Sequence, residues 1–479
     1  MTSPALLAVT DQMRRAVGDE NVLSAHSERV VYECDGFVIE KNCPDVVVFP
    51  TSTEDVAAIV KICNEADVCF LPRGAGTSLA GGCLPVGGGV MIVLTRMNRI
   101  LEINLRDRYA VVEPGVVNIW LTNALRGTGY HYAPDPSSQG ACTIGGNVAT
   151  NSGGPHTLKY GVTVNHTLGI EAVTADGTIV RFGGPTEDPA GLDLTGALVG
   201  SEGTLVIVTK IWVRLTKNPA GVRTMLGVFN SVDDATNAIS EIIGAGIIPA
   251  ALEMMDHGII EALEAAFHFG FPLDAEAVLL IEVDGLEVGL DAERDQIVEL
   301  CQRSGAREVR QAKDAKERQL LWKCRKQAFG AVGRLSPSYC TQDGVVPRTK
   351  LPHILRRIAE IGKQHDVRIV NVFHAGDGNL HPIVLFDERD RAQIKRVLAA
   401  SGQILEECIA CGGSVTGEHG IGVEKIDFMP KLFDDNDLSA MGRMRDAFNP
   451  HNRLSPAKML PTSGACGLEQ THPGRRAAL

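Results

Sequence analysis

The sequence predicts an α+β protein built from more than one domain. Its 479 residues exceed what one ordinary hydrophobic core accommodates. Short β-branched runs alternate with glycine clusters as far as Lys217, whereas longer helices alternate with strands from about Gly221. Such a change of pattern indicates a domain boundary. We expect a helical lead-in over 1–43, a first domain over 44–220, a second domain over 221–445, a return segment over 446–460 and a disordered tail over 461–479.

The first domain begins with the pattern of a strand, a helix and a second strand. Asp45 to Phe49 is a β-branched run. Ser52 to Asp55 is a capping-box pattern, and apolar residues follow it at helical spacing. Val68 to Leu71 reads as the next strand. This order predicts a βαβ unit, which implies a parallel pair of strands with a ligand site at the strand ends.

The alternation of strands and helices in the second domain predicts a ferredoxin-like antiparallel sheet. A strand over Thr224 to Phe229 precedes a helix, and a strand over Ala277 to Val283 precedes a charged helix. A long helix over Lys313 to Gly333 then interrupts the alternation. Strands over Arg368 to Phe373 and His381 to Phe386 resume it.

Composition excludes several classes of partner. The formal net charge of −12 argues against nucleic acid, because phosphate binding depends on clustered Lys and Arg. No stretch approaches the ~20 apolar residues of a transmembrane segment, and no secretory signal pattern is present. We therefore expect a cytoplasmic protein, whose association with the inner membrane would be made through partners. No cysteine spacing suits an iron–sulfur cluster, and the CxxC of Cys408 and Cys411 ends a helical pattern, which favours packing over zinc.

A glycine-rich loop follows the second predicted strand. Leu71 to Gly82 reads LPRGAGTSLAGG, and such backbone approaches a phosphate closely, with Thr77 and Ser78 as added donors. The alternative for one isolated loop is a tight turn. The loop lacks the third glycine of a dinucleotide fingerprint and the Gly-Lys-Ser/Thr of a P-loop, which disfavours a nicotinamide enzyme. Further loops rich in Gly, Ser, Thr and Asn follow at 134–138, 143–154 and 200–203, and together they suit an extended cofactor with a pyrophosphate.

In this order and at these separations, the motifs PRGAGTSLAGG, APDP, TIGGNVATNSGG, KYG and GSEGTLVIVT resemble the FAD-binding domain of the vanillyl-alcohol oxidase (PCMH-type) flavoproteins. The resemblance covers Pro44 to Leu215 and implies a PCMH-type FAD-binding domain. It implies noncovalent FAD, because no histidine lies in the first loop to tether the flavin. It assigns the FAD pyrophosphate to the loop over 71–82. It assigns the isoalloxazine and ribityl chain to the loops over 134–138 and 143–154, and the adenine side to the segment that contains Gly203 and Ile207. The implied FAD contacts are Pro72, Arg73, Gly74, Ala75, Gly76, Thr77, Ser78, Pro134, Asp135, Thr143, Gly146, Asn147, Asn151, Gly153, Gly203 and Ile207.

Two short motifs in the second domain combine histidine with glutamate. In HAGDGNLH, the GDGN turn between two strands brings His374 and His381 toward each other. About 40 residues later, GEHGIG contains Glu418 and His419. Two His and one Glu form a common divalent-metal set that leaves a position for substrate, and a neighbouring histidine suits a base. For any single histidine, the alternative is a structural hydrogen-bonding role.

These motifs resemble the C-terminal cap domain of the glycolate oxidase catalytic subunit, D-lactate dehydrogenase and D-2-hydroxyglutarate dehydrogenase group, over about 221–460. The resemblance implies that His374, His381 and Glu418 bind zinc or another divalent ion and that His419 accepts a proton. It implies that Arg325, on the long helix, binds the substrate carboxylate, the alternative being a solvated basic helix face. Near the C-terminus, FNP and SPAK resemble the family's return to the flavin domain, with Ser455 in place of the usual Asn.

Two departures from the 2-hydroxyglutarate enzymes indicate a smaller substrate. Phe329 stands where those enzymes place a hydroxyl residue, and Tyr339 to Asp343 lacks their lysine for the distal carboxylate. We therefore expect FAD-dependent oxidation of a small D-2-hydroxy acid, glycolate or D-lactate, to the 2-oxo acid by hydride transfer to flavin. The alternatives are a D-2-hydroxyglutarate dehydrogenase, a non-redox transferase acting on glycerol ether lipids, and a non-catalytic FAD-binding assembly subunit.

An electron-accepting partner is also implied, because reduced flavin must pass its electrons onward and this chain has no cluster of its own. The resemblance implies companion flavin and iron–sulfur subunits. An electron-transferring flavoprotein or a quinone is the alternative acceptor.

Overall fold

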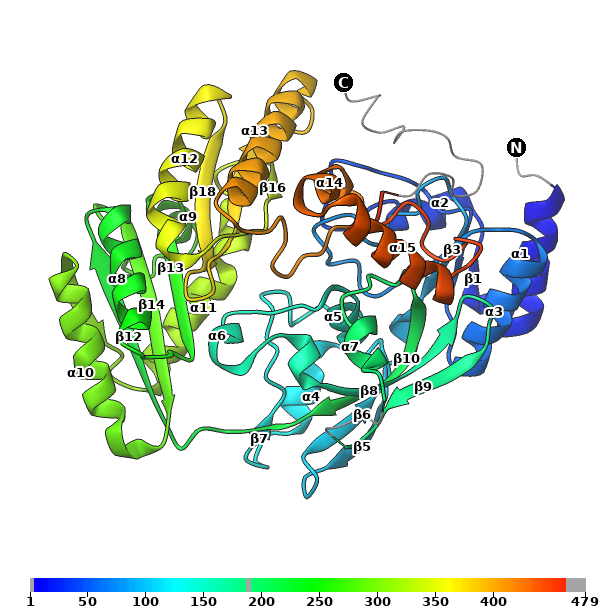
Figure 1. The fold of residues 1–479 in the computed structure, drawn as a ribbon, viewed down its shortest axis with the longest axis horizontal. Coiled ribbons are helices and arrows are strands. Elements are labelled where there is room, and N and C mark those ends of the chain that lie inside the picture. The colour runs from blue at the N-terminus through cyan, green and yellow to red at the C-terminus, as the bar shows by residue number, and fades with distance from the viewer. Residues whose placement is uncertain (1–3, 187–190, 462–479) are drawn as a thin grey trace. The chain divides into compact units, whose positions relative to one another are not determined.

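The computed structural model describes residues 4–186 and 191–461, so nearly all of the predicted C-terminal tail lies outside the described residues. The chain divides into two compact units (Figure 1). Of the described residues, the first unit contains those from 4 to 153, those from 162 to 217 and those from 418 to 461. The second unit contains Gly154–Gly161 and Asn218–Gly417. The chain returns to the first unit at Glu418, earlier than the expected return segment over 446–460, because the loop after Glu418 is hydrogen-bonded there.

The first sheet of the first unit is four-stranded, in the order β1-β2-β4-β3. Its strands are β1 (Val22–Leu23), β2 (Val46–Val48), β4 (Val90–Val93) and β3 (Phe70–Arg73). Both β2 and β3 run parallel to β4, which lies between them, so the strands of the predicted βαβ unit are parallel but are not neighbours. The reason is apolarity on both faces: all four residues of β4 are buried, which suits the centre of a sheet.

The helices of this region are α1 (Pro4–Val17), α2 (His26–Arg29) and α3 (Thr53–Glu65). The predicted start of α3 is confirmed. Ser52 is its N-cap and accepts a hydrogen bond from the Asp55 backbone N–H at 3.0 Å, completing the capping box. The buried residues of α3 pack in one core with those of α1, β2 and β4.

The second sheet of the first unit is antiparallel and five-stranded, in the order β5-β6-β10-β8-β9. Its strands are β5 (Ile100–Asn104), β6 (Tyr109–Val112), β10 (Val206–Arg214), β8 (Thr167–Thr174) and β9 (Ile179–Gly183). Gly177 makes the hairpin turn between β8 and β9 with φ of 84°. The shorter elements of the unit are β7 (Tyr130–His131), β11 (Thr216–Lys217), α4 (Asn118–Ala124), α5 (Ile144–Thr150), α7 (Leu194–Leu198), α14 (Met429–Leu432) and α15 (Asp435–Phe448).

The second unit is built on an antiparallel sheet of nine strands. Seven follow the order β15-β12-β14-β13-β18-β19-β17, while β20 pairs with β16 and β18. The strands are β12 (Gly221–Phe229), β13 (Ala251–Asp256), β14 (Ala277–Gly285), β15 (Ala306–Gln311), β16 (Ser338–Thr341), β17 (Gly344–Val345), β18 (Arg368–His374), β19 (Asn379–Leu380) and β20 (Pro382–Phe386).

Helices pack against this sheet and fix the side chains described below. The helices are α6 (Thr157–Tyr160), α8 (Val232–Gly244), α9 (His257–Phe267), α10 (Glu287–Arg303), α11 (Ala315–Val332), α12 (Leu351–Gln364) and α13 (Arg391–Ala410). Buried residues of α9 and α11 share one core with β12, β13, β14, β18 and β20. The predicted long helix is α11. Strand β13 and helix α9 were missed by the sequence analysis, because Glu253 interrupts the apolar run of β13.

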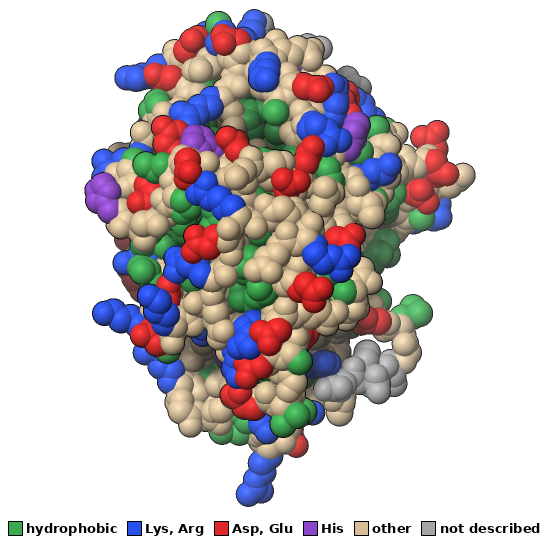
Figure 2. Space-filling view, turned by 90° about the vertical axis from the view of Figure 1, so that its left-hand side faces the viewer, with side chains coloured by type: hydrophobic (Ala, Val, Ile, Leu, Met, Phe, Trp, Pro, Cys, Tyr) green, Lys and Arg blue, Asp and Glu red, His purple; other side chains and the backbone are tan. Residues whose placement is uncertain are grey.

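Charges of both signs alternate on the surface that faces the viewer in Figure 2. On α10 of the second unit, Arg294 lies 2.8 Å from Asp291 and 2.7 Å from Asp295. Exposed pairs of this kind contribute little stability, about 0–1 kcal/mol each. Among the described residues, no helix has the length and apolar character needed to cross a membrane.

Candidate active site

The loop after β3 depends on glycine for its shape. Gly76 has φ of +74°, and a Cβ at this position would collide with the guanidinium of Arg73. Arg73 is buried, donates to the Cys34 carbonyl at 2.9 Å and lies 3.3 Å from the Cys83 thiol. Glycine at position 76 therefore leaves room for the arginine side chain, which supports the loop from inside the protein.

A second predicted flavin loop lies beside the first. A Cβ on Gly74 would lie 2.6 Å from Thr143 Oγ1, which itself accepts the Gly146 backbone N–H at 3.2 Å. Asn118 donates to the Pro134 carbonyl at 3.0 Å and to Asn147 Oδ1 at 3.1 Å. Three segments that the sequence analysis assigned to FAD thus meet within the first unit.

Four more of the predicted flavin contacts, Ser78, Gly203, Asn151 and Ile207, differ in their surroundings. Ser78 Oγ is buried without a hydrogen-bond partner among residues 4–186 and 191–461, which fits a donor to a bound phosphate. A Cβ on Gly203 would lie 2.7 Å from Pro72 Cγ, so Gly203 packs against the start of the first loop. Asn151, with φ of 52°, ends α5 and accepts the Val164 N–H at 2.9 Å. Ile207 is 1% exposed and packs in the core beside β2 and β4, so its side chain is a core residue.

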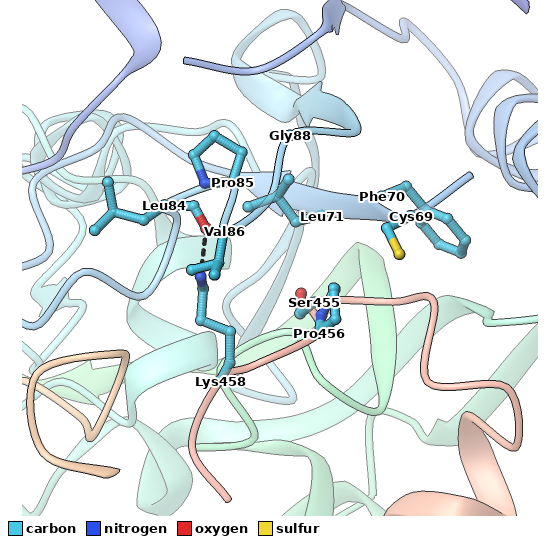
Figure 3. A pocket seen from close by; sticks show the side chains of 10 residues that line it. All are labelled: Cys69, Phe70, Leu71, Leu84, Pro85, Val86, Gly88, Ser455, Pro456 and Lys458. Carbon is cyan, nitrogen blue, oxygen red and sulfur yellow. Dashed lines mark hydrogen bonds between the residues drawn. The ribbon is translucent and has the colours of Figure 1, made fainter. Parts of the chain in front are cut away.

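The C-terminal segment closes the first unit next to β3. Figure 3 shows the residues that line a small hollow between β3 and this segment, where Lys458 Nζ donates to the Leu84 carbonyl. The hollow has a volume of about 10 Å³, far below the roughly 300–1,000 Å³ of small-molecule sites, so it is not a cofactor cleft. Ser455 has φ of +45° and its N–H donates to the Phe70 carbonyl at 2.8 Å. Asn adopts this left-handed backbone more readily than Ser, which accounts for the Asn usual at this position in the resembling family.

A buried glutamate holds the GEHGIG loop in the first unit. Glu202 accepts the backbone N–H groups of Ile421 and Gly422, each at 2.7 Å. Burial raises the pKa of Glu202, and these two hydrogen bonds oppose that rise. Glu418 Oε2 accepts the Gly153 N–H at 3.0 Å. The loop that carries His419 is therefore fixed at both ends.

The second unit contains a buried row of one arginine, one glutamate and one histidine. Strands β13 and β18 pair so that Glu253 is directly opposite His374. Glu253 Oε1 lies 2.8 Å from His374 Nδ1, and Glu253 Oε2 accepts Arg325 Nε at 2.7 Å. Burial alone would raise the pKa of Glu253, but the charges of His374 and Arg325 outweigh it and hold the pKa below its ordinary value.

Arg325 keeps donor capacity in this row. Its side chain is 0% exposed, and its Nη1 has no hydrogen-bond partner in the part of the chain that the structure describes. Buried donors without partners are rare in folded proteins. The solvated-face alternative for this arginine is wrong, because α11 turns Arg325 inward, whereas its neighbour Lys323 is exposed.

His381 has a carboxylate of its own. Its Nδ1 lies 3.8 Å from Asp343 Oδ1, and the two residues are almost completely buried. Asp343 Oδ2 accepts Thr416 Oγ1 at 2.6 Å and the Gly417 N–H at 3.0 Å. The rings of His374 and His381 have centroids 5.1 Å apart and are perpendicular, as the GDGN turn predicted.

Phe329 lies next to this histidine pair. It is one helical turn after Arg325 on α11, and its ring centroid is 6.3 Å from that of His381. The structure thus brings together Arg325, Phe329, His374 and His381 in the second unit. Glu418 and His419 belong to the first unit.

Sequence reasoning did not identify the three supporting carboxylates as functional. Glu253 was the most detectable, since a single acid inside the run AALEMM is unusual for a buried strand. Asp343 and Glu202 have no comparable signal, because turns and glycine-rich loops commonly contain acidic residues.

Two family models match the chain. The model described as "FAD linked oxidases, C-terminal domain" matches residues 218–459, and the model described as "FAD binding domain" matches residues 44–183. The chain belongs to the FAD-linked oxidases and is an FAD-binding flavoprotein.

Individual relatives extend over nearly the whole chain. Glycolate oxidase subunit GlcD of Escherichia coli is 44% identical over 465 residues, which cover 96% of this chain and 93% of the relative. D-lactate dehydrogenase of Anaerostipes hadrus is 31% identical over 456 residues, which cover 93% and 94%. A structure of p-cresol methylhydroxylase superposes with a TM-score of 0.80 at 17% identity, covering 96% of this chain and 97% of that one. The predicted fold class, a PCMH-type flavin domain followed by a cap domain, is confirmed.

Proposed function

We propose that this protein uses FAD to oxidise a small D-2-hydroxy acid, glycolate or D-lactate, to the corresponding 2-oxo acid. The observation that carries the proposal is the buried row of Arg325, Glu253 and His374, with His381 beside it. A fully buried guanidinium with a donor to spare suits a substrate carboxylate, which it can bind through two parallel hydrogen bonds. The relatives named for glycolate and D-lactate support the same substrate class.

FAD would be bound by the first unit. The left-handed backbone at Gly76 and the buried Ser78 Oγ, which has no hydrogen-bond partner among the described residues, support a pyrophosphate site. The loops around Pro134, Thr143 and Asn147 support the flavin. The N5 atom of bound FAD supplies the hydride acceptor.

A divalent metal would be held by His374, His381 and Glu418, with zinc one option. A metal-binding histidine usually turns its second nitrogen toward a carboxylate, and Glu253 and Asp343 stand in that position for the two histidines. Glu418 follows Gly417, whose N–H is bound to Asp343, so one carboxylate supports both motifs. Such a cation would lower the pKa of the substrate hydroxyl.

The residues of the chain then have separate tasks. Arg325 binds the substrate carboxylate and thereby fixes which face of the substrate Cα is presented to the flavin. Glu253 keeps Arg325 and His374 in place by hydrogen bonds to both. His419 accepts the proton of the 2-hydroxyl as the Cα hydride leaves, so that the product is a 2-oxo acid.

Phe329 would limit the size of the substrate. We expect Phe329→Ser to lower the Michaelis constant for D-2-hydroxyglutarate by about tenfold, because cutting back the ring makes room for a longer chain beside His381. The same change would raise the Michaelis constant for D-lactate, since the methyl group loses an apolar neighbour. Steady-state kinetics with both substrates and an artificial acceptor measure the two effects. An unchanged preference would show that Phe329 does not contact substrate.

Electrons would leave the reduced flavin for a partner. The Escherichia coli relative is named as a subunit, which supports companion subunits as the acceptor, and we propose that these contain flavin and iron–sulfur groups. An electron-transferring flavoprotein or a quinone would be the alternative.

Anaerobic bleaching of the flavin tests the proposal. Glycolate, D-lactate, L-lactate and D-2-hydroxyglutarate are added separately to the purified holoprotein, and absorbance at the flavin band is followed. We expect bleaching by glycolate or D-lactate. A flavin that none of the four acids reduces would contradict the proposal and favour the transferase or the assembly subunit.

Removal of the metal is expected to stop the same reaction while leaving FAD bound. Dialysis against a chelator would lower the bleaching rate by at least about a hundredfold, because a Lewis acid contributes several kcal/mol to the reaction. Adding back Zn²⁺ or Mn²⁺ should restore the rate, and metal analysis should follow it. Full activity in a metal-free sample would exclude the metal.

A further inference from the structure

Residues Gly154–Gly161, here called the strap, pack with the second unit although their neighbours in the chain, Gly153 and Val162, belong to the first unit. The strap contains α6 and the KYG motif. Its contacts are made by side chains that the proposed chemistry does not use.

His156 of the strap stacks on α11. Its ring centroid lies 4.9 Å from that of Trp322, with 32° between the planes. Its Nε2 lies 3.5 Å from Glu282 Oε1. Trp322 is three residues before Arg325 on the same helix, so the strap contacts the helix one turn from the proposed carboxylate-binding residue.

Glu282 ties this part of α11 to the sheet. It is 1% exposed and accepts hydrogen bonds from Trp322 Nε1 and from Arg318 Nε, both at 2.7 Å. Thr224 Oγ1 donates to it at 2.5 Å from the neighbouring strand. A buried carboxylate bonded to two residues on one helix fixes the rotation of that helix on the sheet.

The strap also touches the turn between the two histidines. A Cβ on Gly376 would collide with the side chain of Leu158, so the strap packs directly on the GDGN turn. At its far end, Tyr160 Oη donates to Asp284 Oδ2 at 2.6 Å, and Lys159 pairs with the same carboxylate. The strap is therefore anchored independently of the His156 stack.

We propose that His156 is a positioning residue for substrate binding. It holds Trp322, and through it the turn of α11 that carries Arg325, while Leu158 holds the turn that carries His374 and His381. This inference rests on the proposed function, since the residues being positioned are those that bind the hydroxy acid and the metal. His156 itself does not contact substrate.

The size of the effect follows from the stack. A stacked pair of aromatic rings changes an equilibrium constant by about three- to tenfold. We therefore expect His156→Ala to raise the dissociation constant of D-lactate or glycolate by that factor. His156→Phe keeps a ring against Trp322 and should stay within about twofold of the wild type.

Stopped-flow reduction of the holoprotein measures this directly. The rate is recorded against substrate concentration under anaerobic conditions, which separates the dissociation constant from the limiting rate. FAD content and melting temperature are measured on the same samples. His365→Ala is the matched control, since His365 bonds Gln403 elsewhere in the second unit. Tyr160→Phe loosens the strap without altering the stack and should raise the dissociation constant by a smaller factor.

The outcomes separate the two proposals. A raised dissociation constant in His156→Ala, restored in His156→Phe and absent in His365→Ala, supports the positioning role. A lower melting temperature or FAD content with an unchanged dissociation constant overturns it, because His156 would then be merely structural. If His156→Ala does not fold, Tyr160→Phe decides by the same criterion. A wild type that no hydroxy acid reduces overturns the proposed function, and the positioning role with it.

Discussion

Arg325→Met is expected to lower kcat/KM for a 2-hydroxy acid by at least about a hundredfold, with FAD content unchanged. Removing one partner of a buried ion pair costs about 3–5 kcal/mol of folding stability. In this variant the substrate carboxylate also loses its charged partner. Methionine has a similar length and is apolar, so it fills most of the buried space that the Arg325 side chain occupies. Glu253 retains its contact with His374 at 2.8 Å, which should preserve the position of the histidine.

Steady-state kinetics on glycolate and D-lactate measure this loss. Lys323→Met is the matched control, because it removes a positive charge from the exposed side of the same helix. Arg325→Lys should be intermediate, since lysine keeps the charge but not the two parallel hydrogen bonds. If Arg325→Met retained more than a third of the wild-type kcat/KM, the arginine would not be the carboxylate-binding residue.

His419→Ala is expected to lower the limiting rate of flavin reduction by about 10²- to 10⁴-fold, the usual contribution of a general base. The loop should keep its shape, because Glu202 binds backbone N–H groups of Ile421 and Gly422 and not the histidine itself. Substrate affinity should therefore change little, which distinguishes this variant from Arg325→Met.

Stopped-flow reduction again separates rate from affinity. His451→Ala removes an exposed histidine of the same unit and serves as the control. A limiting rate within threefold of the wild type would transfer the role of base to another group. A loss of FAD would show that His419 supports the flavin domain instead of the chemistry.

Local sequence patterns predicted much of the site. Ser52 and Asp55 predicted the start of α3, and the glycines of the first loop predicted a turn with a left-handed backbone at Gly76. The turn residues between His374 and His381 predicted that the two histidines lie close together. Each of these features depends on interactions between residues only a few positions apart, so the pattern alone is sufficient.

Partners distant in the chain were decided by tertiary structure. Glu253 is separated from His374 by 121 residues, and only the pairing of β13 with β18 sets them opposite each other. Glu202 is separated from Ile421 by 219 residues. The placement of β4 between β2 and β3 is of the same kind, since which strand takes the centre depends on what covers both faces.

The sequence by itself determined which residues we propose to hold a cofactor, bind a carboxylate and accept a proton. Only the tertiary structure decided which buried acid supports which of these residues, and that the strap packs beside Trp322. The physical reason is that a buried charge must find a partner wherever the sheet register supplies one. That register is a property of the whole sheet and not of any short stretch of the chain.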